Sequence, residues 1–172
     1  MHVNVKPKLC TGCRMCEMEC SFAHEGKFGT YLSRIRVVKL EPEGIDYPIV
    51  CQMCDKAPCI EACSVDALSK SEAGAILVDP GKCTMCGSCV EACPFGAMNL
   101  DPERGLPIPC DLCGGDPACV KGCPTGALEI KENKKLKKER ETELMQIAQA
   151  KRGSFAHKAT ASLAKAWRRE AR

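Results

Sequence analysis

Sixteen cysteines dominate the sequence, and they fall into four groups of four with no cysteine left over. Groups I and III have the spacing C-x2-C-x2-C-x3-C, whereas groups II and IV have C-x2-C-x4-C-x3-C and C-x2-C-x5-C-x3-C. In chain order the groups are Cys10, Cys13, Cys16 and Cys20; Cys51, Cys54, Cys59 and Cys63; Cys83, Cys86, Cys89 and Cys93; and Cys110, Cys113, Cys119 and Cys123. Soft thiolates repeated at such short intervals indicate metal ligation.

The spacing favours iron–sulfur clusters. A [4Fe–4S] cube presents four iron corners, each of which takes one thiolate. Three cysteines in one short loop supply three corners, and the fourth cysteine, three residues further on, reaches a second cube, as in the bacterial run that ends in Cys-Pro. Pro94 and Pro124 follow the fourth cysteines of groups III and IV, whereas Ser21 and Ser64 stand in groups I and II. Sixteen thiolates predict four [4Fe–4S] clusters.

Three other uses of the cysteines fit less well. Zinc sites usually join two C-x2-C knuckles that lie a dozen or more residues apart, whereas here a third cysteine follows within each loop. A disulfide scaffold requires a secretory context. A further alternative is that one or two groups hold a [3Fe–4S] cluster. Because all sixteen cysteines are present, four complete cubes are favoured. A zinc-stapled interaction module is kept as the alternative from another class.

The remaining residues indicate no bond chemistry. The sequence contains no nucleophile–base constellation and no glycine-rich phosphate loop. The three histidines are expected to be ordinary surface or packing residues, because no cysteine position is vacant for them to fill; they are His2, His24 and His157. The chain is therefore expected not to be an enzyme by itself.

The composition predicts an unusual core. Aromatic residues make up only 4% of the 172 residues, so inorganic clusters must replace part of the usual side-chain packing. Short β-prone runs flank the cysteine groups, at residues 35–40, 49–50, 75–78, 98–100 and 128–130. Each later fourth cysteine opens a similar phrase, which predicts a short helix carrying that cysteine, then a turn, then a strand. The phrases are Cys63-Ser-Val-Asp-Ala-Leu, Cys93-Pro-Phe-Gly-Ala-Met and Cys123-Pro-Thr-Gly-Ala-Leu.

Charge divides the chain into an acidic head and a basic tail. Residues 1–130 carry 12 basic and 17 acidic side chains, a net charge of −5, and residues 131–172 carry 13 and 5, a net charge of +8. The tail is expected to be helical, with Phe155, Leu163 and Trp167 on one apolar face. We interpret it as a docking arm for a groove on a partner or on another copy of the chain, and head-to-tail contacts of that kind build filaments. The acidic head disfavours nucleic acid as a partner.

No stretch is long and apolar enough to span a membrane, and Met1–Cys10 has neither an apolar leader core nor twin arginines. The expected location is the cytoplasm, although a subunit of this kind can also be exported in complex with a partner that carries the signal.

The order of the four groups, with expanded spacing in groups II and IV, resembles the iron–sulfur subunits of molybdenum and tungsten oxidoreductases. That family includes subunits of dimethyl sulfoxide reductase and formate dehydrogenase and the companion of carbon monoxide dehydrogenase. The resemblance covers about residues 5–130. It implies an α+β fold of two nested bacterial-ferredoxin-like (double βαβ) modules, formed by residues 1–45 with 105–130 and by residues 46–104. Residues 131–172 would form a C-terminal helical extension.

The resemblance also implies how the cysteines are shared, because groups I and IV pair and groups II and III pair. Cluster 1 would take Cys10, Cys13, Cys16 and Cys123, and cluster 2 would take Cys110, Cys113, Cys119 and Cys20. Cluster 3 would take Cys51, Cys54, Cys59 and Cys93, and cluster 4 would take Cys83, Cys86, Cys89 and Cys63.

The compact form of the chain is most similar to the small polyferredoxin subunits of bacterial tungsten-dependent aldehyde oxidoreductases. This resemblance implies a relay of single electrons between a large catalytic tungsten or molybdenum subunit and an external acceptor or donor, such as a flavin subunit or a ferredoxin. A free-standing polyferredoxin that carries electrons by diffusion is the alternative within the same class.

Overall fold

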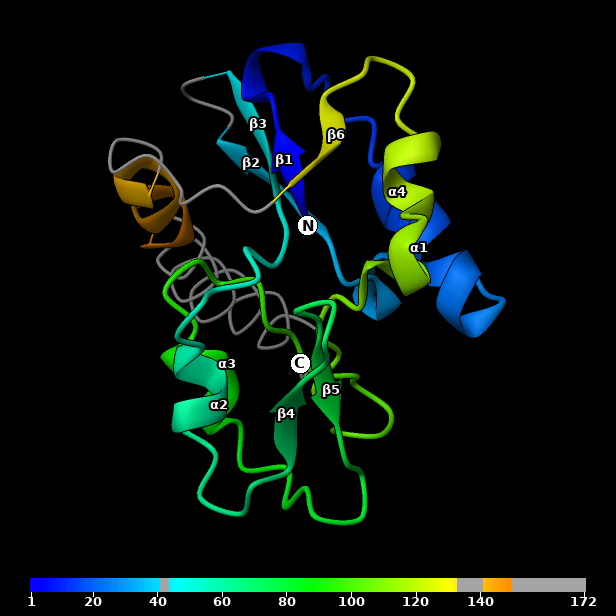
Figure 1. The fold of residues 1–172 in the computed structure, drawn as a ribbon. Coiled ribbons are helices and arrows are strands. Elements are labelled where there is room, and N and C mark those ends of the chain that lie inside the picture. Colours follow the sequence, from blue (N-terminus) through cyan, green and yellow to red (C-terminus); the bar gives the residue numbers. More distant parts are fainter. Residues whose placement is uncertain (41–43, 133–140, 150–172) are drawn as a thin grey trace, which may run out of the picture.

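The structure, a computed structural model, describes residues 1–40, 44–132 and 141–149 (Figure 1). Its elements are short, as expected for a chain whose cysteine loops interrupt every regular segment. The strands are β1 (His2–Val5), β2 (Arg36–Leu40), β3 (Ile45–Ile49), β4 (Leu68–Lys70), β5 (Ile76–Val78) and β6 (Leu128–Lys131). The helices are α1 (Met15–Glu25), α2 (Pro58–Glu61), α3 (Ser88–Ala92) and α4 (Ala118–Lys121), with short 3-10 turns at η1 (Pro7–Leu9), η2 (Thr30–Leu32) and η4 (Leu112–Gly115).

The strands form three antiparallel pairs, so the fold is α+β, as the family resemblance implies. Strands β2 and β3 form one hairpin and β4 and β5 another. The third pair is long-range: β1 lies beside β6, with Val3 opposite Ile130 and Val5 opposite Leu128. The first strand, β1, is therefore held in place by the last strand, β6.

The elements divide into two halves (Figure 1). Strands β1, β2, β3 and β6 lie in one half with α1 and α4, which pack against each other; β4 and β5 lie in the other half with α2 and α3, which also pack together. The buried apolar side chains form two clusters, a larger one that contains Ile35, Tyr47 and Ile49 and a smaller one that contains Leu68 and Ile76. The β2–β3 hairpin extends across residues 45 and 46, where the sequence suggested a boundary.

Two local predictions were wrong in detail. Helices α2, α3 and α4 carry the third cysteine of their groups, and the fourth cysteine follows the helix end; only α1 carries its fourth, Cys20. The run at residues 98–100 forms no strand, and Leu100 makes an isolated bridge to Pro107. Proline has no N–H to donate, and Pro107 and Pro109 therefore prevent a regular ladder there.

Glu17 is a buried carboxylate that joins α1 to β2. Its residue exposure is 1%, and its Oε1 accepts a hydrogen bond from the Val37 backbone N–H at 2.6 Å. Its Oε2 lies 3.7 Å from the Arg14 guanidinium. A buried N–H needs an acceptor, and this carboxylate supplies one from a different element.

Replacing Glu17 with leucine should leave the Val37 N–H without its acceptor and cost about 1–3 kcal/mol of stability. Thermal unfolding of the protein purified without oxygen measures this as a midpoint lowered by several degrees. Glu91→Leu is the matched control, because Glu91 is exposed on α3 and its replacement should change stability by less than about 0.5 kcal/mol. Equal midpoints for the two variants would contradict the assigned role.

Residues 141–149, drawn in orange in Figure 1, form a helix that packs onto the head of its own chain. Leu144, Ile147 and Ala148 are buried, and the first two belong to the larger apolar cluster. A Cβ on Gly96 would lie only 3.5 Å from the Ala148 Cβ, so the helix approaches the head closely at that glycine. The apolar stripe of Phe155, Leu163 and Trp167 lies outside the described residues.

Leu144→Ala should loosen this helix, because removing a fully buried leucine costs about 2–5 kcal/mol. Hydrogen exchange read by mass spectrometry should then rise over residues 141–149, with little change in the rest of the head. Met145→Ala provides the control, since Met145 is 43% exposed on the same helix. Unchanged protection in the leucine variant would show that the contact contributes little.

Candidate metal centres

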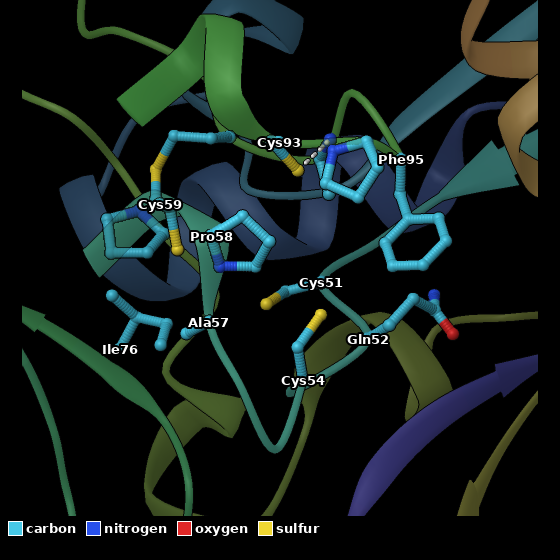
Figure 2. A pocket seen from close by; sticks show the side chains of 13 residues that line it. Cys51, Gln52, Cys54, Ala57, Pro58, Cys59, Ile76, Cys93 and Phe95 are labelled. Atoms are coloured by element: carbon cyan, nitrogen blue, oxygen red, sulfur yellow. Dashed lines mark hydrogen bonds between the residues drawn. The ribbon is translucent and has the colours of Figure 1, made fainter. Parts of the chain in front are cut away.

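All sixteen cysteines are free thiols, and they come together in sets that mix the sequence groups. The clearest set surrounds a cavity of about 420 Å³ that includes its open mouth. Figure 2 shows Cys51, Cys54 and Cys59 from group II around this cavity together with Cys93 from group III. The rest of the wall is mainly apolar, and Ala57, Ile76 and Phe95 belong to it.

A second cavity, of about 360 Å³, gathers the remaining cysteines of these two groups. Cys83, Cys86 and Cys89 of group III line it together with Cys63 of group II. Apolar side chains that are partly exposed, among them Val65, Met85 and Leu100, also line it. Cys86 is itself exposed, so this cavity opens toward the surface.

Groups I and IV mix in the same way. Burial raises the pKa of Cys16 to about 12, and the charges of Cys10, Cys123 and Cys13 add to the increase. Three cysteines of group I therefore lie near the last cysteine of group IV.

The other cysteines of groups I and IV form a second set, which takes one cysteine from group I and three from group IV. Burial raises the pKa of Cys110 to about 12, and Cys119 and Cys20 reinforce the increase. Cys20 also raises the pKa of Cys113, after the larger effect of burial. The last cysteine of group I thus lies with the first three of group IV.

The donors fit iron–sulfur clusters. Burial raises the pKa of most of these thiols, and the mutual repulsion of their thiolates adds to it, so a metal-free site keeps them protonated near neutral pH. A cationic metal core reverses the balance and releases the protons. Four thiols around an apolar space are the ligand set that a [4Fe–4S] cluster requires.

The first C-x2-C of every group has the same backbone turn. The residue immediately before the second cysteine is left-handed each time, with φ of 65° at Gly12, 49° at Met53, 58° at Met85 and 59° at Leu112. A side chain strains this conformation by about 1–2 kcal/mol, which the surrounding structure must offset. At Gly12 a Cβ would also overlap the Asp46 carboxylate, so a side chain there requires Asp46 to move.

Backbone N–H groups bind the sulfurs of the fourth cysteines. The N–H of Ala67 donates to Cys63 Sγ at 3.3 Å, and that of Ala97 donates to Cys93 Sγ at 3.4 Å. At Cys123 burial acts to raise the pKa, but hydrogen bonds from the Thr125 hydroxyl and from backbone groups that include Ala127 lower it overall. These contacts give the repeated phrase a role in binding the sulfur of the fourth cysteine, which sequence reasoning missed although the repeat was visible.

The sequence interpretation also missed His24. We expected an ordinary surface or packing residue, but the ring is largely buried, with a side-chain exposure of 11%. It lies against the sulfurs of Cys20 and Cys113, which belong to different groups. The available signal was its position four residues after Cys20 on a helix, where side chains are neighbours.

Short helices and small antiparallel sheets that collect free thiols four at a time define an iron–sulfur protein of the ferredoxin-like class. The profile of the 4Fe-4S dicluster domain family matches residues 44–133, just over half of the chain, and the protein belongs to this family. The matched segment contains groups II, III and IV, whereas group I lies before it.

The chain is similar to several proteins of redox systems. It is 46% identical over 85 residues to the polyferredoxin-like subunit of an aliphatic sulfonate oxidoreductase from Pyrococcus furiosus, covering 49% of each chain. It is 39% identical over 86 residues to the putative electron transport protein YsaA of Escherichia coli, covering 46% of this chain and 53% of that protein. A subunit of the Salmonella typhimurium tetrathionate reductase is 30% identical over 85 residues, or 46% of this chain and 34% of that one. The matches thus span about half or less of these relatives.

No helix among residues 1–40, 44–132 and 141–149 has both the length and the apolar character needed to cross a bilayer.

Proposed function

We propose that the protein relays single electrons through four [4Fe–4S] clusters held by its sixteen cysteines. Clusters 1 to 4 take the ligand sets that the family resemblance implies. The observation that carries the proposal is the gathering of thiols across groups, in which each set has three cysteines from one group and the fourth from another. This crossed arrangement is the one that two linked cubes need.

Contacts between the sets support a continuous path. Cys16 of cluster 1 contributes to the raised pKa of Cys119 in cluster 2, after burial and two nearer cysteines. In the same way, Cys110 of cluster 2 contributes to the raised pKa of Cys51 in cluster 3, although burial is again the main cause. Clusters 3 and 4 exchange Cys93 and Cys63 between their loops. The proposed order is therefore cluster 1, 2, 3, 4, with exposed Cys13 and Cys86 at the two ends.

Analysis of protein purified without oxygen tests the clusters directly. About sixteen iron and sixteen sulfide per chain are expected, together with bleaching of the visible absorption by dithionite. Zinc at about four per chain, without iron or sulfide, would instead establish the zinc-stapled interaction module. Iron near fifteen per chain with a [3Fe–4S] signal in the oxidised protein would contradict four complete cubes.

The proposed partner is a large catalytic subunit that contains tungsten or molybdenum, with a flavin subunit or a ferredoxin at the other end of the relay. Relatives named as subunits of oxidoreductases support a role of this kind, in which the chain itself performs no bond chemistry. The proposed location is the cytoplasm. Anoxic affinity purification from the native cell should recover the catalytic subunit with its metal. Recovery of the chain alone, fully loaded and exchanging electrons by diffusion, would favour the free-standing polyferredoxin.

We propose two nested modules, residues 1–45 with 105–130 and residues 46–104, followed by the tail. The β1–β6 pairing and the packing of α1 on α4 and of α2 on α3 support this nesting. The tail is proposed to dock on another copy of the chain and to build a filament. Deleting residues 153–172 should then reduce the particle mass in solution, and an unchanged mass would exclude self-association through this segment.

A further inference from the structure

His24 makes two short contacts with oxygen atoms. Its Nδ1 lies 2.7 Å from the backbone carbonyl oxygen of Cys20, one turn earlier on α1. Its Nε2 lies 2.9 Å and 3.2 Å from the two carboxylate oxygens of Asp111, which comes from the start of group IV. The ring is therefore held from both sides by elements 87 residues apart.

The chemistry of these partners makes the ring a hydrogen-bond donor. A carbonyl oxygen and an ionised carboxylate can only accept hydrogen bonds. The ring therefore donates through a nitrogen that carries a hydrogen, to the Cys20 carbonyl or to the Asp111 carboxylate. The ring sits in a largely buried site, where hydrogen bonds are stronger than in water.

The same two nitrogens face sulfur. Nδ1 lies 3.9 Å from Cys20 Sγ, and Nε2 lies 3.8 Å from Cys113 Sγ. Asp111 completes the arrangement, because its Oδ1 also accepts the backbone N–H of Cys113 at 2.9 Å. One ring thus touches two of the four sulfurs proposed for cluster 2, one from each contributing group.

We propose that His24 is the positioning residue that raises the reduction potential of cluster 2. The inference rests on the proposed function, since it needs Cys20, Cys110, Cys113 and Cys119 to share one [4Fe–4S] cluster. Such a cluster with its thiolates changes from a net charge of about −2 to about −3 when it accepts one electron. Hydrogen bonds from a ring N–H to the sulfurs stabilise the more negative form, so they make reduction easier.

The test is an anoxic potentiometric titration with dithionite as the reductant, followed by electron paramagnetic resonance. In His24→Gln one component should move to a lower potential, with the iron content unchanged. That component is assigned to cluster 2 by its absence in Cys113→Ala. His24→Lys supplies N–H donors at the same position, and it should restore most of the potential.

Ser88→Ala is the matched control, because it removes a hydroxyl 3.3 Å from Cys86 Sγ in proposed cluster 4. It should leave the cluster 2 component in place. A fully loaded His24→Gln protein with an unchanged cluster 2 potential would overturn the inference, as would an equal fall in His24→Lys. The iron and sulfide content of the unmodified protein is measured first. If it falls well short of about sixteen of each per chain, the four proposed clusters are rejected, and the role of His24 is not the cause.

Discussion

Cys93→Ala should cost the protein one complete [4Fe–4S] cluster, seen as a loss of about four iron atoms per chain. Cys93 belongs to group III in the sequence, but it lines the cavity of Cys51, Cys54 and Cys59 (Figure 2). It also raises the pKa of Cys54 and Cys59, in each case second only to burial, which places its sulfur close to theirs. Alanine leaves one iron corner of that cluster without a ligand.

The comparison with neighbouring variants makes this prediction sharp. Cys59→Ala should remove the same paramagnetic component as Cys93→Ala, because both residues are assigned to cluster 3. Cys83→Ala should remove a different component, although Cys83 belongs to the same sequence group as Cys93. Electron transfer through the chain should fall in all three variants. If Cys93→Ala and Cys83→Ala remove the same component, ligation follows the sequence groups and is not crossed.

Removing iron from the whole protein should unfold the head. Four cysteines of the larger apolar cluster are buried, namely Cys16, Cys20, Cys110 and Cys119. The chain has few aromatic residues to fill that space, and metal binding in small sites contributes on the order of 10 kcal/mol to folding. A loss of this size exceeds the net stability of most domains.

The measurement uses a chelator under anoxic conditions with a thiol reductant, so that disulfides do not form. Circular dichroism should lose its cooperative thermal transition, and a protease should cut within residues 1–132 after iron is removed. Adding iron and sulfide back should restore both properties. A metal-free head that keeps a cooperative transition and resists the protease would show that side-chain packing alone suffices.

The sequence predicted the parts of this fold that depend on local spacing. The cysteine groups and the strands at residues 36–40, 76–78 and 128–131 follow from ligand spacing, turn residues and β-branched runs, whereas the α+β class came from the family resemblance. The repeated phrase after each fourth cysteine was visible too, but its interpretation needed the structure. The left-handed residue at Asp66, Gly96 or Gly126 turns the chain there, and the alanine N–H that follows points at the sulfur at Cys63 and Cys93.

Features that depend on contacts distant in sequence were not predictable. Strand β1 pairs with β6, and nothing in the first residues of the chain indicates that their partner lies at residues 128–131. Nothing in the sequence around His24 marks it as unusual, because two of its partners, Asp111 and Cys113, lie 87 and 89 residues away. The docking of residues 141–149 places Ala148 against Gly96, a contact that no helical pattern in the tail reveals.

The pairing of β1 with β6 has a consequence for biosynthesis. On the ribosome, residues 51–93 emerge together, and in the proposed assignment they already contain every ligand of clusters 3 and 4. Clusters 1 and 2 each need one partner from the opposite end of the head, so Cys10, Cys13 and Cys16 must wait for Cys123. The inner half can therefore mature first, and the nascent N-terminal loop stays open to the cluster-delivery machinery until translation has passed residue 131.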